Sequence, residues 1–157
     1  MESSPYHIPV LLHVATDALI TKKNGLYIDL TFGGGGHSKA ILSKINDGQL
    51  IAFDQDEDAF QNDIDDVRFT LVRQNFKYVQ NVLLSRGINK VDGILADLGV
   101  SSHQFDTPER GFSYRFDGEL DMRMNTSSSI TAFHVVNEYD ESNLVRILVS
   151  YGEFKRG

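Results

Sequence analysis

The sequence has no cysteine among its 157 residues. It can therefore form no disulfide, hold no zinc through thiolates and use no cysteine nucleophile, and it is compatible with a reducing cytoplasm. Long hydrophobic runs are missing as well, because no apolar stretch approaches the roughly 18 residues that a membrane span requires. Residues 1–10 have neither the basic region nor the long apolar region of a secretory signal. We expect a soluble, unprocessed, cytoplasmic protein with no membrane partner.

Positive charge is scarce in this chain. Its 15 lysine and arginine residues are outnumbered by 22 aspartate and glutamate residues, which gives a formal net charge of −7. That is the wrong sign for long-range attraction of nucleic acid, so any RNA binding must be local. Segment 54–66 is acidic and contains no lysine or arginine, and we expect it to avoid phosphate.

The composition is otherwise that of a globular protein, 41% hydrophobic and 24% charged, in which short apolar runs alternate with helical periodicity. The apolar runs predict strands over 26–30, 50–53, 69–72 and 91–98. The helical spacing predicts helices over 10–20, 38–45, 57–62 and 76–85. This alternation predicts an α/β, Rossmann-like parallel sheet of at least four strands, in the order 3-2-1-4, with right-handed crossovers.

The alternation stops after residue 99. Residues 101–129 are polar, aromatic and glycine-containing and predict a functional loop, and helical spacing returns only over 130–137 and 142–151. A four-stranded parallel sheet would normally continue into further strands, so we expect a truncated form of the fold. Because an unpaired edge strand invites association, we expect self-association or reduced stability.

The first predicted strand ends in Asp29 and leads into four glycines, residues 33–36. Glycine permits positive φ and lets a ligand approach the backbone closely. The dinucleotide fingerprint G-x-G-x-x-G fails, because Ser38 occupies its third glycine position. The spacing D-x-x-x-G-x-G fits a site for S-adenosylmethionine better. The alternative is that the glycines only form a tight connection.

Asp54 closes the second predicted strand, where doubly wound folds place an acid that binds ribose hydroxyls. A carboxylate has the acceptors that a diol requires. The alternative for an acid at this place is a helix N-cap, for which Asp56 competes.

Asp97 is predicted to end the fourth strand. In the order 3-2-1-4 the first and fourth strands are neighbours, so Asp29, the glycines and Asp97 should converge at one edge of the sheet. The alternative is that Asp97 forms the turn before Gly99.

The histidines do not have the spacing of a metal site, so we predict no metal. His37 follows the glycines and is expected to begin a helix there, with hydrogen bonding at the helix start as its alternative role. No G-x-S-x-G elbow is present, which leaves hydrolase chemistry unsupported.

Segment 110–124 interleaves aromatic and basic side chains. Single-stranded bases stack on such groups, and arginine can hold phosphate beside them. The alternative is a loop folded over its own phenylalanine and methionine residues.

Several longer motifs together resemble a known family. They are HIPVLL at 7–12, YID at 27–29, TFGGGGHS at 31–38, DGILADLGVSS at 92–102, ERGFS at 109–113, DG at 117–118 and LDMRM at 120–124. They resemble the MraW/RsmH family, bacterial S-adenosylmethionine-dependent methyltransferases that modify the N4 amino group of a cytosine in small-subunit ribosomal RNA. The resemblance implies that the partner is this RNA or the ribosomal particle. It also implies cofactor contacts from Gly35, Gly36, His37, Asp54, Phe76, Asp97 and Gln104.

The resemblance also shapes the expected domains and mechanism. It implies an incomplete S-adenosylmethionine-binding domain over 1–105, and a substrate loop with the start of an inserted helical domain over 106–157. We expect direct methyl transfer, with Asp97 or the Leu98 and Gly99 carbonyls accepting a hydrogen bond from the amino group. Val14 departs from the family pattern, which has glutamate there. The competing hypotheses are a NAD-dependent oxidoreductase and a non-catalytic nucleotide- or RNA-binding module.

Overall fold

The computed structural model describes residues 9–155. The first two residues of the HIPVLL motif lie outside this range. The chain divides into two compact units, Met1–Gly99 and Val100–Gly157, which we describe separately. The expected functional boundary between residues 105 and 106 stays a prediction.

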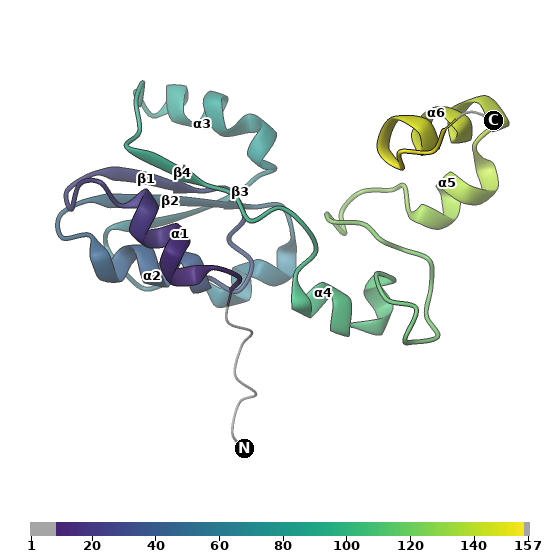
Figure 1. Cartoon of the computed structure of the whole chain (residues 1–157), viewed down its shortest axis with the longest axis horizontal. Coiled ribbons are helices and arrows are strands. Elements are labelled where there is room, and N and C mark those ends of the chain that lie inside the picture. Colours follow the sequence, from purple (N-terminus) through teal and green to yellow (C-terminus); the bar gives the residue numbers. More distant parts are fainter. Residues whose placement is uncertain (1–8, 156–157) are drawn as a thin grey trace, which may run out of the picture. The chain divides into compact units, whose positions relative to one another are not determined.

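The first unit is built on a four-stranded sheet (Figure 1). Its strands are β1 (Leu26–Asp29), β2 (Gln49–Asp54), β3 (Phe69–Arg73) and β4 (Gly93–Leu95). Their order is β3-β2-β1-β4 and every pairing is parallel, which confirms the predicted topology. This order places β1 between β2 and β4, so the carboxyl ends of these three strands lie at one edge of the sheet.

Both faces of the sheet are covered, as parallel sheets require. Helices α1 (Leu12–Leu19) and α2 (Gly36–Lys44) cover one face, where Tyr27 and Leu50 are fully buried. Successive strand residues point to opposite faces, so Ile28 instead packs under α3 (Val79–Ser85) on the other face. The continuous apolar runs that predicted strands reflect this double burial.

Two 3₁₀ helices replace parts of the predicted α-helices. Segment η1 (Glu57–Asn62) is 3₁₀ throughout, and η2 (Phe76–Tyr78) forms the first turn before α3. Helix α2 begins two residues before the predicted start, directly after Gly35.

The fourth strand is shorter than the predicted 91–98. Its ladder ends where the Leu30 N–H donates to the Leu95 carbonyl, 2.9 Å away. Two residues later, the Asp97 N–H donates to the Thr31 hydroxyl at 2.8 Å instead of to a neighbouring strand. The prediction that Asp97 ends the strand was therefore wrong, because a side chain diverts its backbone group out of the ladder.

The second unit is helical in its described part, with α4 (Ser102–Asp106), η3 (Pro108–Arg110), α5 (Ala132–Glu138) and α6 (Glu141–Tyr151). The prediction of a loop over 101–129 was therefore wrong for its first part, which forms α4 and η3. Ser101 and Gln104 form a capping box there, a signal that the sequence contains.

An ordered loop joins η3 to α5 in this unit. Arg123 pairs with Asp121 at 2.6 Å and donates to the Thr126 and Ser128 carbonyls. The buried Arg110 donates to the Arg123 carbonyl at 2.9 Å. The loop is therefore held by guanidinium groups that satisfy its backbone carbonyls.

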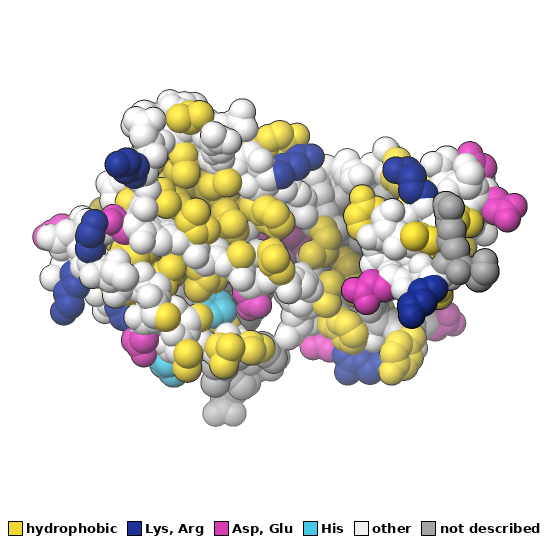
Figure 2. All heavy atoms as spheres, turned by 45° about the horizontal axis from the view of Figure 1, so that its top comes forward, with side chains coloured by type: hydrophobic (Ala, Val, Ile, Leu, Met, Phe, Trp, Pro, Cys, Tyr) yellow, Lys and Arg dark blue, Asp and Glu magenta, His cyan; other side chains and the backbone are white. Residues whose placement is uncertain are grey.

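Apolar side chains also remain exposed over the first unit, as Figure 2 shows. They include Leu84, Ile94 and Leu98. Between residues 9 and 155, no helix has the length and apolar character needed to cross a membrane.

Candidate functional site

Asp29 lies at the end of β1, directly before the glycine turn of the candidate site. It is completely buried, and its carboxylate accepts hydrogen bonds from the Ser38 hydroxyl at 2.7 Å and the Thr31 N–H at 3.1 Å. Burial raises the pKa of Asp29, while these two hydrogen bonds and nearby His37 oppose the rise. Because no part of Asp29 is exposed, it organises the turn and the start of α2 rather than meeting a ligand.

The glycine turn after β1 contains an open position at Gly33. This residue has φ 51°, and a Cβ added to it would meet nothing within 4 Å. Its N–H donates to the Asp54 carboxylate at 2.8 Å, and its carbonyl accepts from the Asn62 side chain at 3.2 Å. The turn is thus fixed from both sides and leaves space beside its backbone.

The last two glycines of the run, Gly35 and Gly36, are constrained by packing. Gly35 has φ 75°, and a Cβ there would lie 3.0 Å from the Phe32 ring. A Cβ on Gly36 would lie 2.4 Å from the Pro9 ring. Both glycines are required by the fold, so the alternative of a tight connection accounts for part of the glycine run.

Asp54 ends β2 beside this turn. It also accepts a hydrogen bond from the Asp56 N–H at 2.9 Å, and burial raises its pKa. The N-cap of η1 is Asp56, which accepts from the Asp58 N–H. Asp54 is therefore not needed as that cap. A carboxylate has about four lone-pair positions, so Asp54 can accept further donors such as ribose hydroxyls.

Phe76 lies on the neighbouring loop, after β3. It is 39% exposed, so part of its ring is open to a ligand. Asn75 caps η2 and donates to the Gln55 side chain at 2.7 Å. This hydrogen bond joins the loops after β2 and β3, so Phe76 stands near the end of β2.

His37 and Asp97 approach each other across the ends of β1 and β4. His37 Nδ1 is 3.9 Å from Asp97 Oδ2. The imidazole is buried in the first turn of α2, and its Nε2 has no hydrogen-bond partner among the described residues. The Asp97 carboxylate is half-exposed and therefore accessible to a ligand.

Thr31 is the residue that sequence reasoning missed at this edge. Its hydroxyl accepts from the Asp97 N–H, which links the loop after β1 to the loop after β4. A hydroxyl residue two positions after a strand-ending acid was the only available signal.

Gln104 belongs to the second unit, where its side chain is buried. Its Oε1 accepts from the Ser101 N–H at 2.9 Å, and its own N–H donates to the Ser101 hydroxyl at 3.1 Å. Gln104 thus stabilises the start of α4, and its expected cofactor contact stays a prediction.

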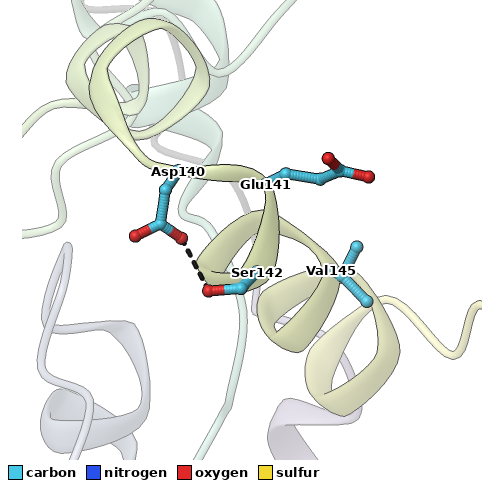
Figure 3. A pocket seen from close by; sticks show the side chains of 4 residues that line it. All are labelled: Asp140, Glu141, Ser142 and Val145. Carbon is cyan, nitrogen blue, oxygen red and sulfur yellow. Dashed lines mark hydrogen bonds between the residues drawn. The ribbon is translucent and has the colours of Figure 1, made fainter.

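A separate hollow lies at the start of α6. Asp140, Glu141, Ser142 and Val145 line it (Figure 3). Asp140 accepts from the Asn143 N–H and the Ser142 hydroxyl, each at 2.8 Å, and the backbone hydrogen bond is the main cause of its lowered pKa. This acid is the cap of α6, and none of the predicted site residues lines the hollow.

The edge of the sheet suits a ligand with hydrogen-bond donors better than a phosphate. The Gly33 N–H, which could otherwise bind a phosphate, is taken by Asp54. Two carboxylates lie at this edge, those of the half-buried Asp54 and the half-exposed Asp97. No cluster of three histidine, aspartate or glutamate residues suited to a metal ion occurs in the described range.

Comparison with known proteins matches the chain to one family. The sequence model of the MraW methylase family covers residues 4–156. Ribosomal RNA small subunit methyltransferase H of Flavobacterium johnsoniae is 59% identical over 151 residues, which are 96% of this chain and 50% of that protein. The protein of the same name from Bacteroides fragilis is 57% identical over 155 residues, 98% of this chain and 51% of that protein. The chain thus spans about half the length of the curated relatives it matches.

Proposed function

Because the chain belongs to the MraW methylase family, we propose that it binds S-adenosylmethionine and serves in methylation of the N4 amino group of a cytosine in small-subunit ribosomal RNA. The relatives named above are ribosomal RNA small subunit methyltransferases. The partner is then this RNA or the ribosomal particle that contains it.

The open Gly33 backbone between Asp54 and Asp97 carries the proposal. When bound, S-adenosylmethionine supplies a methyl group on a positively charged sulfur. The carboxylates match that positive charge, and the open space beside Gly33 admits a ligand to the backbone. The buried, unpartnered Nε2 of His37 is a further polar group close to this edge.

Each residue of the site has a distinct role in the proposal. Asp54 accepts the ribose hydroxyls, and Phe76 packs against the adenine. Gly35, Gly36 and His37 line the methionine side at the start of α2. The fixed hydrogen bonds of Asp29 and Asn62 keep this turn in place.

Asp97 orients the substrate amino group. The Thr31 hydroxyl fixes its backbone at 2.8 Å, so the carboxylate projects from an anchored main chain. It accepts a hydrogen bond from the amino group, which localises the nitrogen lone pair and aligns it for transfer. The Leu98 and Gly99 carbonyls are alternative acceptors. The target base must leave its stack to reach these groups.

Calorimetry with S-adenosylmethionine on Gly33→Ala tests the site. Gly87→Ala is the matched control, because both glycines have positive φ and open space around the position of a Cβ. Both variants carry a similar backbone strain, of about 1–2 kcal/mol. Only the methyl group at position 33 enters the proposed ligand space, so we expect affinity to fall at least tenfold in that variant alone.

Three outcomes would contradict the proposal. Unchanged affinity of Gly33→Ala for S-adenosylmethionine would place the ligand elsewhere. Equilibrium dialysis in which NADH binds more tightly than S-adenosylmethionine would favour the oxidoreductase alternative. Binding of S-adenosylmethionine without methyl transfer to small-subunit particles would favour the non-catalytic module for this chain.

A further inference from the structure

An arginine of the second unit contacts two aromatic rings. The Arg115 guanidinium carbon is 5.5 Å from the centre of the Phe105 ring and 5.6 Å from the centre of the Phe116 ring. Both rings are more than one-third exposed. The three side chains therefore form one partly solvated cluster, to which cation–π attraction contributes.

The same loop exposes a tyrosine almost completely. Tyr114 precedes Arg115 and is 98% exposed, so nothing in its own unit covers either face of its ring. Isolated exposed aromatics are ordinary on protein surfaces. Here the exposed tyrosine directly precedes, in the sequence, an arginine that contacts two aromatic rings. We call Phe105 of α4 and the loop residues Tyr114, Arg115 and Phe116 together the stacking loop.

Hydrogen bonds within the second unit hold Arg115 of the stacking loop in place without a bound partner. Arg115 Nη2 donates to Asp106 at 2.7 Å, and Nε donates to the Ser113 hydroxyl at 3.2 Å. At the loop's end, a Cβ on Gly118 would lie 2.6 Å from the Pro108 carbonyl oxygen, which shows how closely the chain returns to η3. Preorganisation lowers the entropy cost of binding.

One end of the guanidinium is still available. Nη1 of Arg115 makes no hydrogen bond within the described part of the chain, although the other two nitrogens do. It can therefore donate to a phosphate or a base edge without breaking an existing hydrogen bond.

We propose that the stacking loop binds single-stranded RNA, with a base on the Tyr114 ring and the adjacent phosphate on Arg115. This rests on the proposed function, since it assigns the RNA contact of that activity to named residues. A nucleic acid fits better than a protein, because exposed aromatic rings beside a guanidinium match the alternation of flat bases and phosphates. The net charge of −7 requires such local recognition.

Fluorescence anisotropy of the full chain with a labelled, unstructured pyrimidine 10-mer of RNA tests the stacking loop. Tyr114→Ala should weaken binding roughly 5- to 100-fold, and Tyr114→Phe should keep it, because the ring provides the stacking. Tyr151→Ala is the matched control, since Tyr151 is 81% exposed in α6 of the same unit. It should change the affinity less than twofold.

Salt dependence separates the arginine contact from the stacking. Arg115→Met should reduce the slope of log affinity against log salt by about 0.7, the value for one phosphate on a single strand. Arg146→Met, an exposed arginine on α6, should leave the slope unchanged.

Three results would overturn the inference: no binding of the RNA by the unmodified chain, equal losses for Tyr114→Ala and Tyr151→Ala, or equal affinity for a duplex of the same sequence. Binding of a protein at this loop in place of RNA would overturn it too. Calorimetry with S-adenosylmethionine on Tyr114→Ala keeps the two proposals apart. Lost RNA binding with intact cofactor binding supports the inference, whereas absent cofactor binding in every variant counts against the proposed function alone.

Discussion

At the scale of single residues, Asp29 shows how a buried charge can serve a site without touching its ligand. It is the acceptor for both Ser38 and Thr31. Thr31 in turn holds Asp97. A hydrogen-bonded series therefore runs from the strand end to the residue that we expect to orient the substrate, and its first member is the one with no exposed surface.

Substitution of Asp29 should separate hydrogen bonding from charge. Asp29→Ala removes the acceptor of the buried Ser38 hydroxyl and of the half-buried Thr31 N–H. We expect the free energy of unfolding to fall by about 1–3 kcal/mol for the buried donor and by less for the other. Asp29→Asn keeps one acceptor, so its free energy of unfolding should fall by less than that of Asp29→Ala. Denaturant unfolding followed by circular dichroism measures the free energies of both variants. Equal losses would contradict the role of Asp29 as a hydrogen-bond acceptor.

The pH dependence of Asp29→Asn has a definite sign. Burial raises the pKa of Asp29 in the folded chain, so its contribution to stability is complete below the unfolded pKa and is lost as pH rises through the folded pKa. The asparagine variant lacks this loss. Its stability relative to the unmodified chain should therefore rise as pH increases above the unfolded pKa, and a falling difference would contradict the raised pKa.

At the scale of elements, Arg68 joins the start of β3 to the end of α2. Its Nη1 donates to the Ile45 and Asn46 carbonyls at 2.7 and 3.0 Å, while Nε and Nη2 bind Asp66. These carbonyls belong to the end of a helix, where unpaired acceptors and the helix dipole favour a cation. Arg68 lowers the pKa of Asp66 to about 2.

Arg68→Lys should therefore loosen this junction although it preserves the charge. Lysine cannot reproduce the planar fork that reaches Asp66 and two carbonyls together. We expect a melting temperature lower by about 2–4 °C and faster hydrogen exchange over residues 41–46. Arg86→Lys is the control, because Arg86 is exposed at the end of α3. Equal effects of the two substitutions would rule out a specific role for Arg68.

At the scale of the whole molecule, β4 has only one neighbouring strand within the described residues. Ile94 in its centre is 51% exposed, and Leu98 just beyond it is 70% exposed. Unpaired backbone groups beside apolar side chains favour association of chains. If the chain self-associates as the sequence predicts, we expect the edge strand β4 and its exposed apolar side chains to form the contact.

Sedimentation velocity over a series of protein concentrations tests this surface. The unmodified chain should show a mass that rises with concentration, and Ile94→Glu should suppress the rise, because a charge on an edge strand opposes pairing. Val67→Glu is the control, since Val67 is fully exposed before β3. A monomer at all concentrations would contradict the prediction.

Local sequence patterns were sufficient to predict the parallel sheet, its strand order and the edge at which the acids and glycines gather. These features follow from local patterns: apolar runs for doubly buried strands, glycines for a tight turn, and acids at strand ends. Three other features depend on contacts made in the folded chain: Asp56 as the cap of η1, the burial of Asp29 and the close approach of Gly36 to Pro9.

The same holds for the early end of β4 and for the link between Thr31 and Asp97. That hydrogen bond joins residues 66 positions apart. No local pattern records it, because which donor meets which acceptor is settled only when β1 and β4 pack side by side. A sequence pattern specifies what each segment can bury, whereas the partners of its polar groups depend on the segments that folding brings to them.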